Sequence, residues 1–164
     1  MAKTQIISAS NFVNLIKENK KISETIIPEL IRKLIRQSIN SNTYTHFHSG
    51  DDIFSPGFDG IVKDNIIEHR FLQKGSFVVE IGVITGSRQS ISKIKKDYSK
   101  RKSEENGINK SEYNYIAIST AILNSTSKQK YSDEYNNEAI FRKVIILDAI
   151  DITSWLGDHI NIGI

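Results

Sequence analysis

The sequence predicts an α/β protein with a mixed central sheet flanked by helices. Strand-like and helical segments alternate along the second half of the chain, as in strand–helix–strand units with parallel strands. Consecutive strand-like segments come before them, which favours an antiparallel start to the sheet. Residues 75–85 are apolar on both faces, which is typical of a central strand.

The first helices are predicted from apolar residues that recur with helical spacing. Residues 10–18 have one apolar face, and Ser10 is a candidate N-cap. Residues 23–38 carry a longer apolar stripe, with Ser23 as a candidate N-cap. Because proline is tolerated mainly in the first turn, we expect Pro28 near the helix start, or a helix that begins later.

The middle of the chain is predicted to form several strands. Residues 40–52 are a polar connection around a short strand. Residues 57–62 and 65–72 are predicted as two strands, with a hairpin turn at residues 63–65 between them. The longer strand at residues 75–85 follows.

The rest of the chain continues the alternation of helix and strand. We expect a helix at residues 89–102 and a strand at 113–120. A loop plus helix over 124–138, a strand at 143–149 and a short amphipathic helix at 149–159 complete the fold. Three consecutive strands followed by strand–helix–strand crossovers give the mixed sheet.

Length and composition indicate one domain, residues 1–164, with a real core. Hydrophobic residues make up 38% and charged residues 25% of the chain, which is typical of a globular protein. We expect no membrane span and no signal peptide, so the cytoplasm is the expected compartment. The absence of cysteine excludes disulfides and thiolate chemistry.

Two acids lie within apolar strands, where an unpaired charge is costly. Asp59 and Glu80 should each project from one strand face, and suitable pairing would bring them together. A divalent cation such as Mg²⁺ relieves the repulsion between two carboxylates. Taken singly, Asp59 is also compatible with a turn, and Glu80 with a core acid paired to a lysine or arginine.

Five short motifs in order resemble the PD-(D/E)XK nuclease superfamily. More narrowly, the chain is similar to the nuclease-like domain at the N-terminus of some large bacterial proteins associated with phage defence. The resemblance covers most of the chain and implies a restriction-endonuclease-like fold. The motifs are "IPELIRKLI" at 27–35, "SGD" at 49–51, "PGFDG" at 56–60, "GSFVVEIG" at 75–82 and "KIKKDYSKR" at 93–101.

The resemblance implies the roles of the central residues. Asp59 and Glu80 would hold Mg²⁺, for which Mn²⁺ can substitute, and the backbone carbonyl of Ile81 would add a ligand. The family usually places a lysine two residues after the glutamate, but this chain has Gly82 there. Lys93 on the next helix would take over the catalytic role, although an ordinary surface lysine is an equal alternative.

Other polar residues are candidates for weaker roles. Glu29 and Asp51 are candidate accessory acids, although Glu29 is more simply explained by an i,i+4 pair with Lys33, and Asp51 by a turn. His46 and His48 have strand spacing, but no third zinc ligand is visible. Residues 93–102 contain six basic residues in ten, and such a run is either a solvated helix face or a surface that binds phosphates. The candidate contacts to DNA phosphates in this run are Lys95, Lys96, Lys100 and Arg101.

These observations predict a metal-dependent DNA endonuclease, expected as an effector domain in anti-phage defence. The alternative is a catalytically inactive module of the same fold that binds nucleic acid or has a regulatory or interaction role, and RNA is a weaker candidate substrate. Expected partners are DNA, a second copy of the chain or a larger assembly, and a C-terminal sensor domain if this is the N-terminal domain of a longer protein. No membrane partner is expected.

Overall fold

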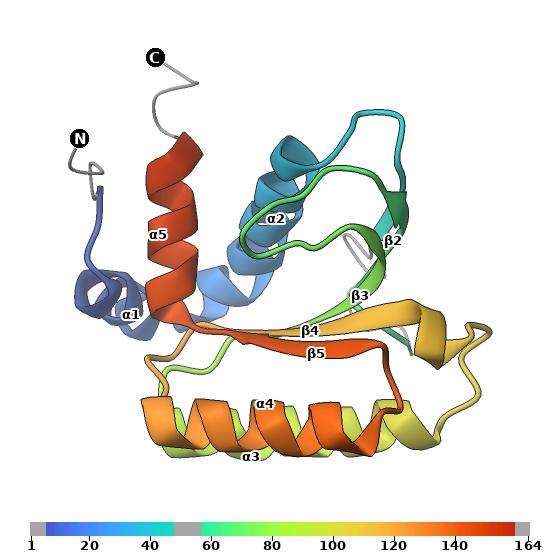
Figure 1. The fold of residues 1–164 in the computed structure, drawn as a ribbon. Helices are drawn as coiled ribbons and strands as arrows, with labels where there is room; N and C mark the ends of the chain where they lie inside the picture. The colour runs from blue at the N-terminus through green and yellow to red at the C-terminus, as the bar shows by residue number, and fades with distance from the viewer. Residues whose placement is uncertain (1–5, 48–56, 160–164) are drawn as a thin grey trace.

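A mixed five-stranded sheet forms the centre of the computed structural model, which describes residues 6–47 and 57–159 (Figure 1). The strand order is β1-β2-β3-β4-β5. The first three strands pair antiparallel, and β3, β4 and β5 pair parallel. The predicted α/β class and mixed sheet are confirmed. The strands are β1 (Tyr44–Phe47), β2 (Gly60–Asn65), β3 (Gly75–Gly82), β4 (Tyr113–Ser119) and β5 (Lys143–Leu147).

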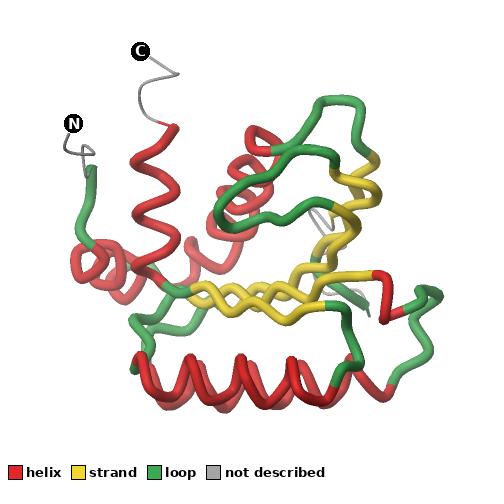
Figure 2. Tube along the Cα trace, viewed as in Figure 1, coloured by secondary structure: helices red, strands yellow, loops and turns green. Residues whose placement is uncertain are grey.

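Helices cover both faces of this sheet, as Figure 2 shows by the red coils on either side of the yellow strands. One face carries α1 (Ala9–Glu18), α2 (Lys20–Ser38) and α5 (Ala149–His159). The other carries α3 (Ser87–Ser103) and α4 (Ser125–Glu138). A short 3₁₀ helix, Lys110–Glu112, leads into β4. Within the described residues, no helix has the length and apolar character needed to cross a bilayer.

The alternation of side chains along β3 divides the interior into two cores. Phe77 and Val79 point into the core beneath α1, α2 and α5. Val78 points the other way, into an aromatic-rich core beneath α3 and α4. Glu80 has the same parity as Val78, so the strand period places its carboxylate on the α3 side.

The predicted hairpin turn and the strand at residues 65–72 are both wrong. The turn residues belong to β2, and a loop connects β2 to β3. Asp64 has a positive φ of 54°, and the ladder shifts register there, so the extra residue forms a bulge without reversing the chain. The Asn65 side chain then bonds both the N–H and the carbonyl of Ile67, which holds the loop. Ile66 is 66% exposed, so the apolar residues of this segment do not form a buried strand.

The helix starts also differ from the prediction. Ser8, not Ser10, caps α1 by accepting a hydrogen bond from a backbone N–H in the first turn. Ser23 already lies inside α2, because its N–H donates to the carbonyl of Asn19. Pro28 lies inside α2 as well. Its missing N–H costs one helical hydrogen bond, and the buried stripe on either side of it explains why the helix continues.

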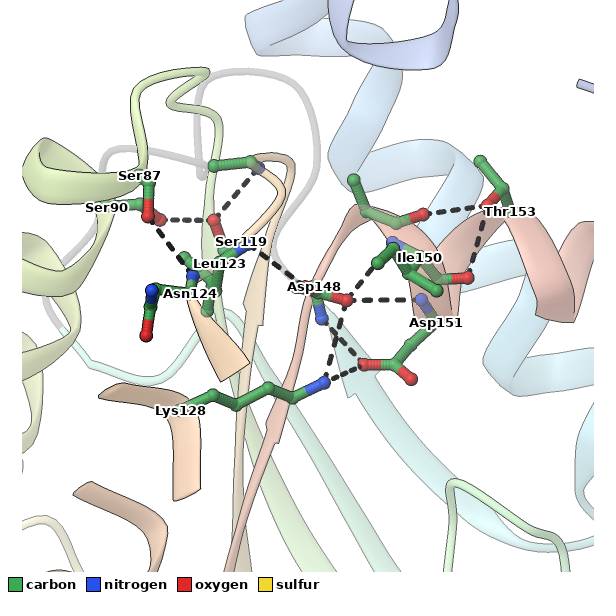
Figure 3. Close-up of polar contacts among 12 residues, drawn as sticks. Ser87, Ser90, Ser119, Leu123, Asn124, Lys128, Asp148, Ile150, Asp151 and Thr153 are labelled. Atoms are coloured by element: carbon green, nitrogen blue, oxygen red, sulfur yellow. Dashed lines mark hydrogen bonds and ion pairs between the residues drawn. The ribbon is translucent and has the colours of Figure 1, made fainter. Parts of the chain in front are cut away.

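A buried aspartate joins the ends of the parallel strands β4 and β5 (Figure 3). Asp148 precedes α5 and accepts hydrogen bonds from the N–H groups of Ile150 and Asp151, at 3.1 and 3.3 Å. Its second oxygen accepts from the N–H of Leu123, beyond β4, at 3.1 Å. Asp151 in turn accepts from the Asp148 N–H and from Lys128, whose Nζ lies 2.6 Å away. The cluster caps α5 and fixes the loop after β4.

Replacing this aspartate should destabilise the fold. Asp148→Ala removes a helix cap and leaves the buried N–H of Leu123 without an acceptor, so we expect the free energy of unfolding to fall by about 2–3 kcal/mol. Urea denaturation followed by circular dichroism measures this loss. Glu105→Ala in an exposed loop is the control and should change the value by less than about 0.5 kcal/mol. Equal losses in the two variants would contradict the structural role of Asp148.

Candidate active site

The two predicted acids lie on the same face of the sheet. Gly60 of β2 is paired with Val79 of β3, and antiparallel pairing therefore places Asp59 opposite Glu80. Asp59 Oδ2 accepts a hydrogen bond from the N–H of Ile81 at 2.6 Å, which holds the carboxylate against β3. The Asp59 and Glu80 side chains are close enough for a hydrogen bond between them to lower the pKa of Asp59.

Burial dominates the electrostatics of this acid pair. Glu80 is only 6% exposed. Burial raises the pKa of Glu80 to about 8, the neighbouring Asp59 charge adds to the shift, and a hydrogen bond from Arg101 opposes it. Burial also raises the pKa of Asp59, against the hydrogen bonds from Ile81 and Glu80. Two acids that resist ionising together are a suitable donor pair for a cation.

The guanidinium of Arg101 compensates Glu80. Its Nε donates to Glu80 Oε1, and its two terminal nitrogens bond the carbonyl of Gly57 at 2.6 Å and Glu104 Oε2 at 2.8 Å. Burial acts to lower the pKa of Arg101, but Glu80 and Glu104 outweigh it and raise the pKa. The guanidinium carbon lies 5.5 Å from the centre of the Phe58 ring.

Arg101 is therefore not the exposed phosphate contact that we predicted. It is 8% exposed, and its donors are bound within the protein. The sequence did contain a signal, because Ile94, Tyr98 and Arg101 follow one another at helical spacing and all three are buried. The interpretation of Glu80 as a core acid paired with an arginine describes this contact.

Lys93 reaches the site across Gly82. A Cβ atom on residue 82 would lie 3.3 Å from Cδ of Lys93, so the absence of a side chain there leaves room for the lysine stem. Lys93 Nζ donates to Asp97 Oδ2 at 2.7 Å, an i,i+4 pair on α3. The positive charge of Lys93 also acts to lower the pKa of Asp59. The structure thus brings Lys93 to the acid pair from a position 11 residues beyond Gly82.

The remaining candidate DNA contacts lie on the outside of α3. Lys95 and Lys96 are exposed, and Lys95 Nζ lies 5.1 Å from the centre of the Tyr131 ring. Lys100 is exposed too, with its Nζ 3.8 Å from Glu104. Lys95 and Lys93 leave α3 in different directions, which matches their separation of about 200° around a helix.

The candidate accessory acids do not join the acid pair. Glu29 is exposed on α2, whose buried face packs in the core on the opposite side of the sheet from Glu80. Its partner is Arg32, at 3.0 Å, and not the predicted Lys33. Asp51 lies outside the described residues, as does His48.

The donor set suits Mg²⁺ better than a cation that needs a complete protein cage. Residues 6–47 and 57–159 contain no group of three His, Cys, Asp or Glu side chains arranged to hold a metal. Mg²⁺ commonly uses one or two carboxylates and takes its other oxygens from water and substrate phosphate. Asp59 and Glu80 fit that requirement, and the carbonyl of Ile81 as a further ligand stays a prediction.

Sequence reasoning missed Tyr115 on β4. Its side chain is fully buried and lines a small cavity together with Glu80, Lys93 and Asp97. Side chains alternate between the two sheet faces along β4, but all seven residues of this strand are buried. The sequence therefore has no alternation of polar and apolar residues that would show which face Tyr115 lies on.

Comparison with family models, with curated proteins and with solved structures found no match to this chain.

The raised pKa of Glu80 predicts a pH effect on metal-free stability. Because the folded-state value of about 8 exceeds the ordinary 4.5, the stabilising contribution is complete below pH 4.5 and is lost as pH rises through 8. Glu80→Gln cannot ionise but keeps an acceptor for Arg101. We therefore expect the variant to lose less stability than the parent between pH 5 and about 9. Urea unfolding in EDTA measures this, and parallel pH profiles for the two proteins would rule it out.

Proposed function

We propose that this protein is a Mg²⁺-dependent nuclease that hydrolyses phosphodiester bonds in DNA. The observation that carries the proposal is the interacting carboxylate pair of half-buried Asp59 and buried Glu80, with Lys93 beside it. The ordered motifs support the same conclusion, as does the succession of helices, antiparallel strands and a β3-α3-β4 crossover. An effector role in anti-phage defence is part of this proposal and rests on the resemblance alone.

The protein groups divide the work of hydrolysis between them. Asp59 and Glu80 would hold Mg²⁺, which when bound supplies Lewis-acid activation of water and neutralises charge on the phosphate. The hydrogen bond from the Ile81 N–H fixes the Asp59 carboxylate against β3 before any ligand arrives. This preorganisation means that little reorientation of the Asp59 side chain is needed during the reaction.

Lys93 would supply the cation that the family usually places two residues after the glutamate. Its stem crosses Gly82, the position where that lysine would otherwise begin. The Lys93 ammonium donates a hydrogen bond to the Asp97 carboxylate at 2.7 Å, and this contact limits the directions in which Lys93 can point. From there the ammonium would orient the attacking water or stabilise negative charge that develops on the phosphate.

A second candidate function is favoured by the Glu80–Arg101 pair. A guanidinium already bonds the carboxyl group that a metal would need, and replacing it has an electrostatic cost. A module that keeps the fold, binds nucleic acid through α3 and does not cleave it would have this arrangement. Metal binding and cleavage assays separate the two functions.

Cleavage of plasmid DNA tests the enzyme directly. With Mg²⁺ or Mn²⁺, we expect the parent to convert supercoiled plasmid to nicked and linear forms, and Asp59→Ala and Glu80→Ala to abolish this. Lys93→Ala should lower the rate by at least about 100-fold while metal binding stays close to that of the parent. Lys95→Ala is the matched control on the same helix and should change the rate only modestly.

Two results would contradict the enzyme proposal. One is intact plasmid with the parent protein at every metal concentration, where retained metal or DNA binding would instead favour the non-cleaving module. The other is cleavage by Asp59→Ala at the parent rate. If only Lys93→Ala cuts at the parent rate, the role of Lys93 is wrong and the two acids keep theirs.

DNA binding should depend strongly on salt and weakly on sequence. Lys95, Lys96 and Lys100 are exposed on α3 and would contact phosphates, which carry no sequence information. Three such contacts predict that the logarithm of affinity falls by roughly 2.7 per tenfold rise in salt, at about 0.9 per contact. Fluorescence anisotropy with two unrelated duplexes and EDTA measures the slope. Lys96→Ala should reduce it by about 0.9, and a flat response would contradict α3 as the interface.

A further inference from the structure

We propose that Tyr115 is a positioning residue of the acid site, whose hydroxyl group holds one water molecule against the Glu80 carboxylate. The inference rests on the proposed function, because it assigns Tyr115 to the same metal-binding pair. Tyr115 does not reach the substrate in this proposal. It acts through Glu80.

The first observation is a buried hydroxyl group without a partner. Tyr115 is 0% exposed, and its Oη has no hydrogen-bond partner among the described residues. A buried polar group left unpaired costs stability, and most such groups in proteins bond another group or an ordered water. Tyr98, a buried tyrosine on α3, does have a partner, because its hydroxyl group donates a hydrogen bond to Glu138 at 3.3 Å.

The second observation is a small cavity that Tyr115 lines. Its volume is about 10 Å³, near the lower limit that one water molecule requires. Its lining includes Tyr115, Glu80, Lys93 and Asp97, so it offers the two to four polar partners that a buried water needs. A water molecule there would connect β4 to the acid pair on β3.

The strand register explains how the tyrosine comes to this place. In the parallel ladder Val78 is paired with Tyr115 and Glu80 with Ala117. The small side chain of Ala117 leaves space beside Glu80. Aromatic contacts hold the Tyr115 ring, with the Tyr98 ring centre at 5.5 Å and the Phe141 ring centre at 5.0 Å.

The charges around Tyr115 favour its role as a donor. Burial raises the pKa of Tyr115 well above its ordinary value, and the nearby charges of Glu80 and Asp97 raise it further. The hydroxyl group therefore keeps its proton and can donate to a water that in turn donates to Glu80. Lost outer partners of a metal ligand commonly reduce metal affinity by about 10- to 100-fold.

Tyr115→Phe tests the inference because it removes only the hydroxyl group. The matched control is Tyr135→Phe, a buried tyrosine on α4 that stacks on Tyr98 and is not part of the cavity lining. We expect calorimetric titration with MnCl₂ to show about tenfold weaker binding or worse for Tyr115→Phe, and parent affinity for Tyr135→Phe. The unfolding midpoint of each variant reports whether its fold is intact.

A high-resolution crystal structure of the parent protein gives a test that needs no variant. It should show a water within hydrogen-bond distance of both Tyr115 Oη and the Glu80 carboxylate. The absence of that water, or a folded Tyr115→Phe protein that binds Mn²⁺ as tightly as the parent, would overturn the role of Tyr115 and leave the proposed function standing. A parent protein that does not bind Mn²⁺ at all would reject the proposed function, and the positioning role with it.

Discussion

The buried pair of Glu80 and Arg101 connects the parts of this structure on which the proposed function depends. Glu80 belongs to β3, Arg101 to α3, and the same guanidinium also binds the carbonyl of Gly57, just before Asp59. One side chain therefore ties the crossover helix to the central strand and to the segment that enters β2. Removing one partner of such a pair leaves a buried charge uncompensated, at a typical cost of 3–5 kcal/mol.

The same pair sets the main electrostatic constraint on the proposed chemistry. A site with two carboxylates and no cation would hold a proton, and burial pushes Glu80 in that direction. Arg101 supplies a cation from within the chain, so a metal at this place must share or replace it. Lys93 has a different arrangement, because its ammonium forms an ion pair with Asp97 on its own helix and acts on Asp59 through its charge alone. A metal would therefore compete directly with Arg101 for Glu80.

The sequence was sufficient for the fold class and for the parity of the two acids. Both follow from periodicity, because alternation along β3 dictates that Glu80 shares a face with Val78. It was not sufficient for the connection after β2. The path of the chain there depends on the left-handed backbone conformation of Asp64 and on the hydrogen bonds of the Asn65 side chain. Neither feature produces a periodic pattern in the sequence. The burial of Arg101 was missed for a related reason. Composition identifies the basic run, but only the helical spacing of Arg101 from Ile94 and Tyr98 shows that it lies on the buried face of the helix.

The order of strand pairing has a consequence for how the protein folds. The antiparallel ladder joins residues close in sequence, such as Val62 and Phe77, whereas the parallel ladder joins Phe77 to Asn114 across the whole of α3. Closing the longer loop costs more chain entropy, so the β2–β3 ladder should form earlier. The two carboxylates would then meet before α3 delivers the guanidinium. Docking of α3 would then be the step that brings a compensating positive charge to Glu80.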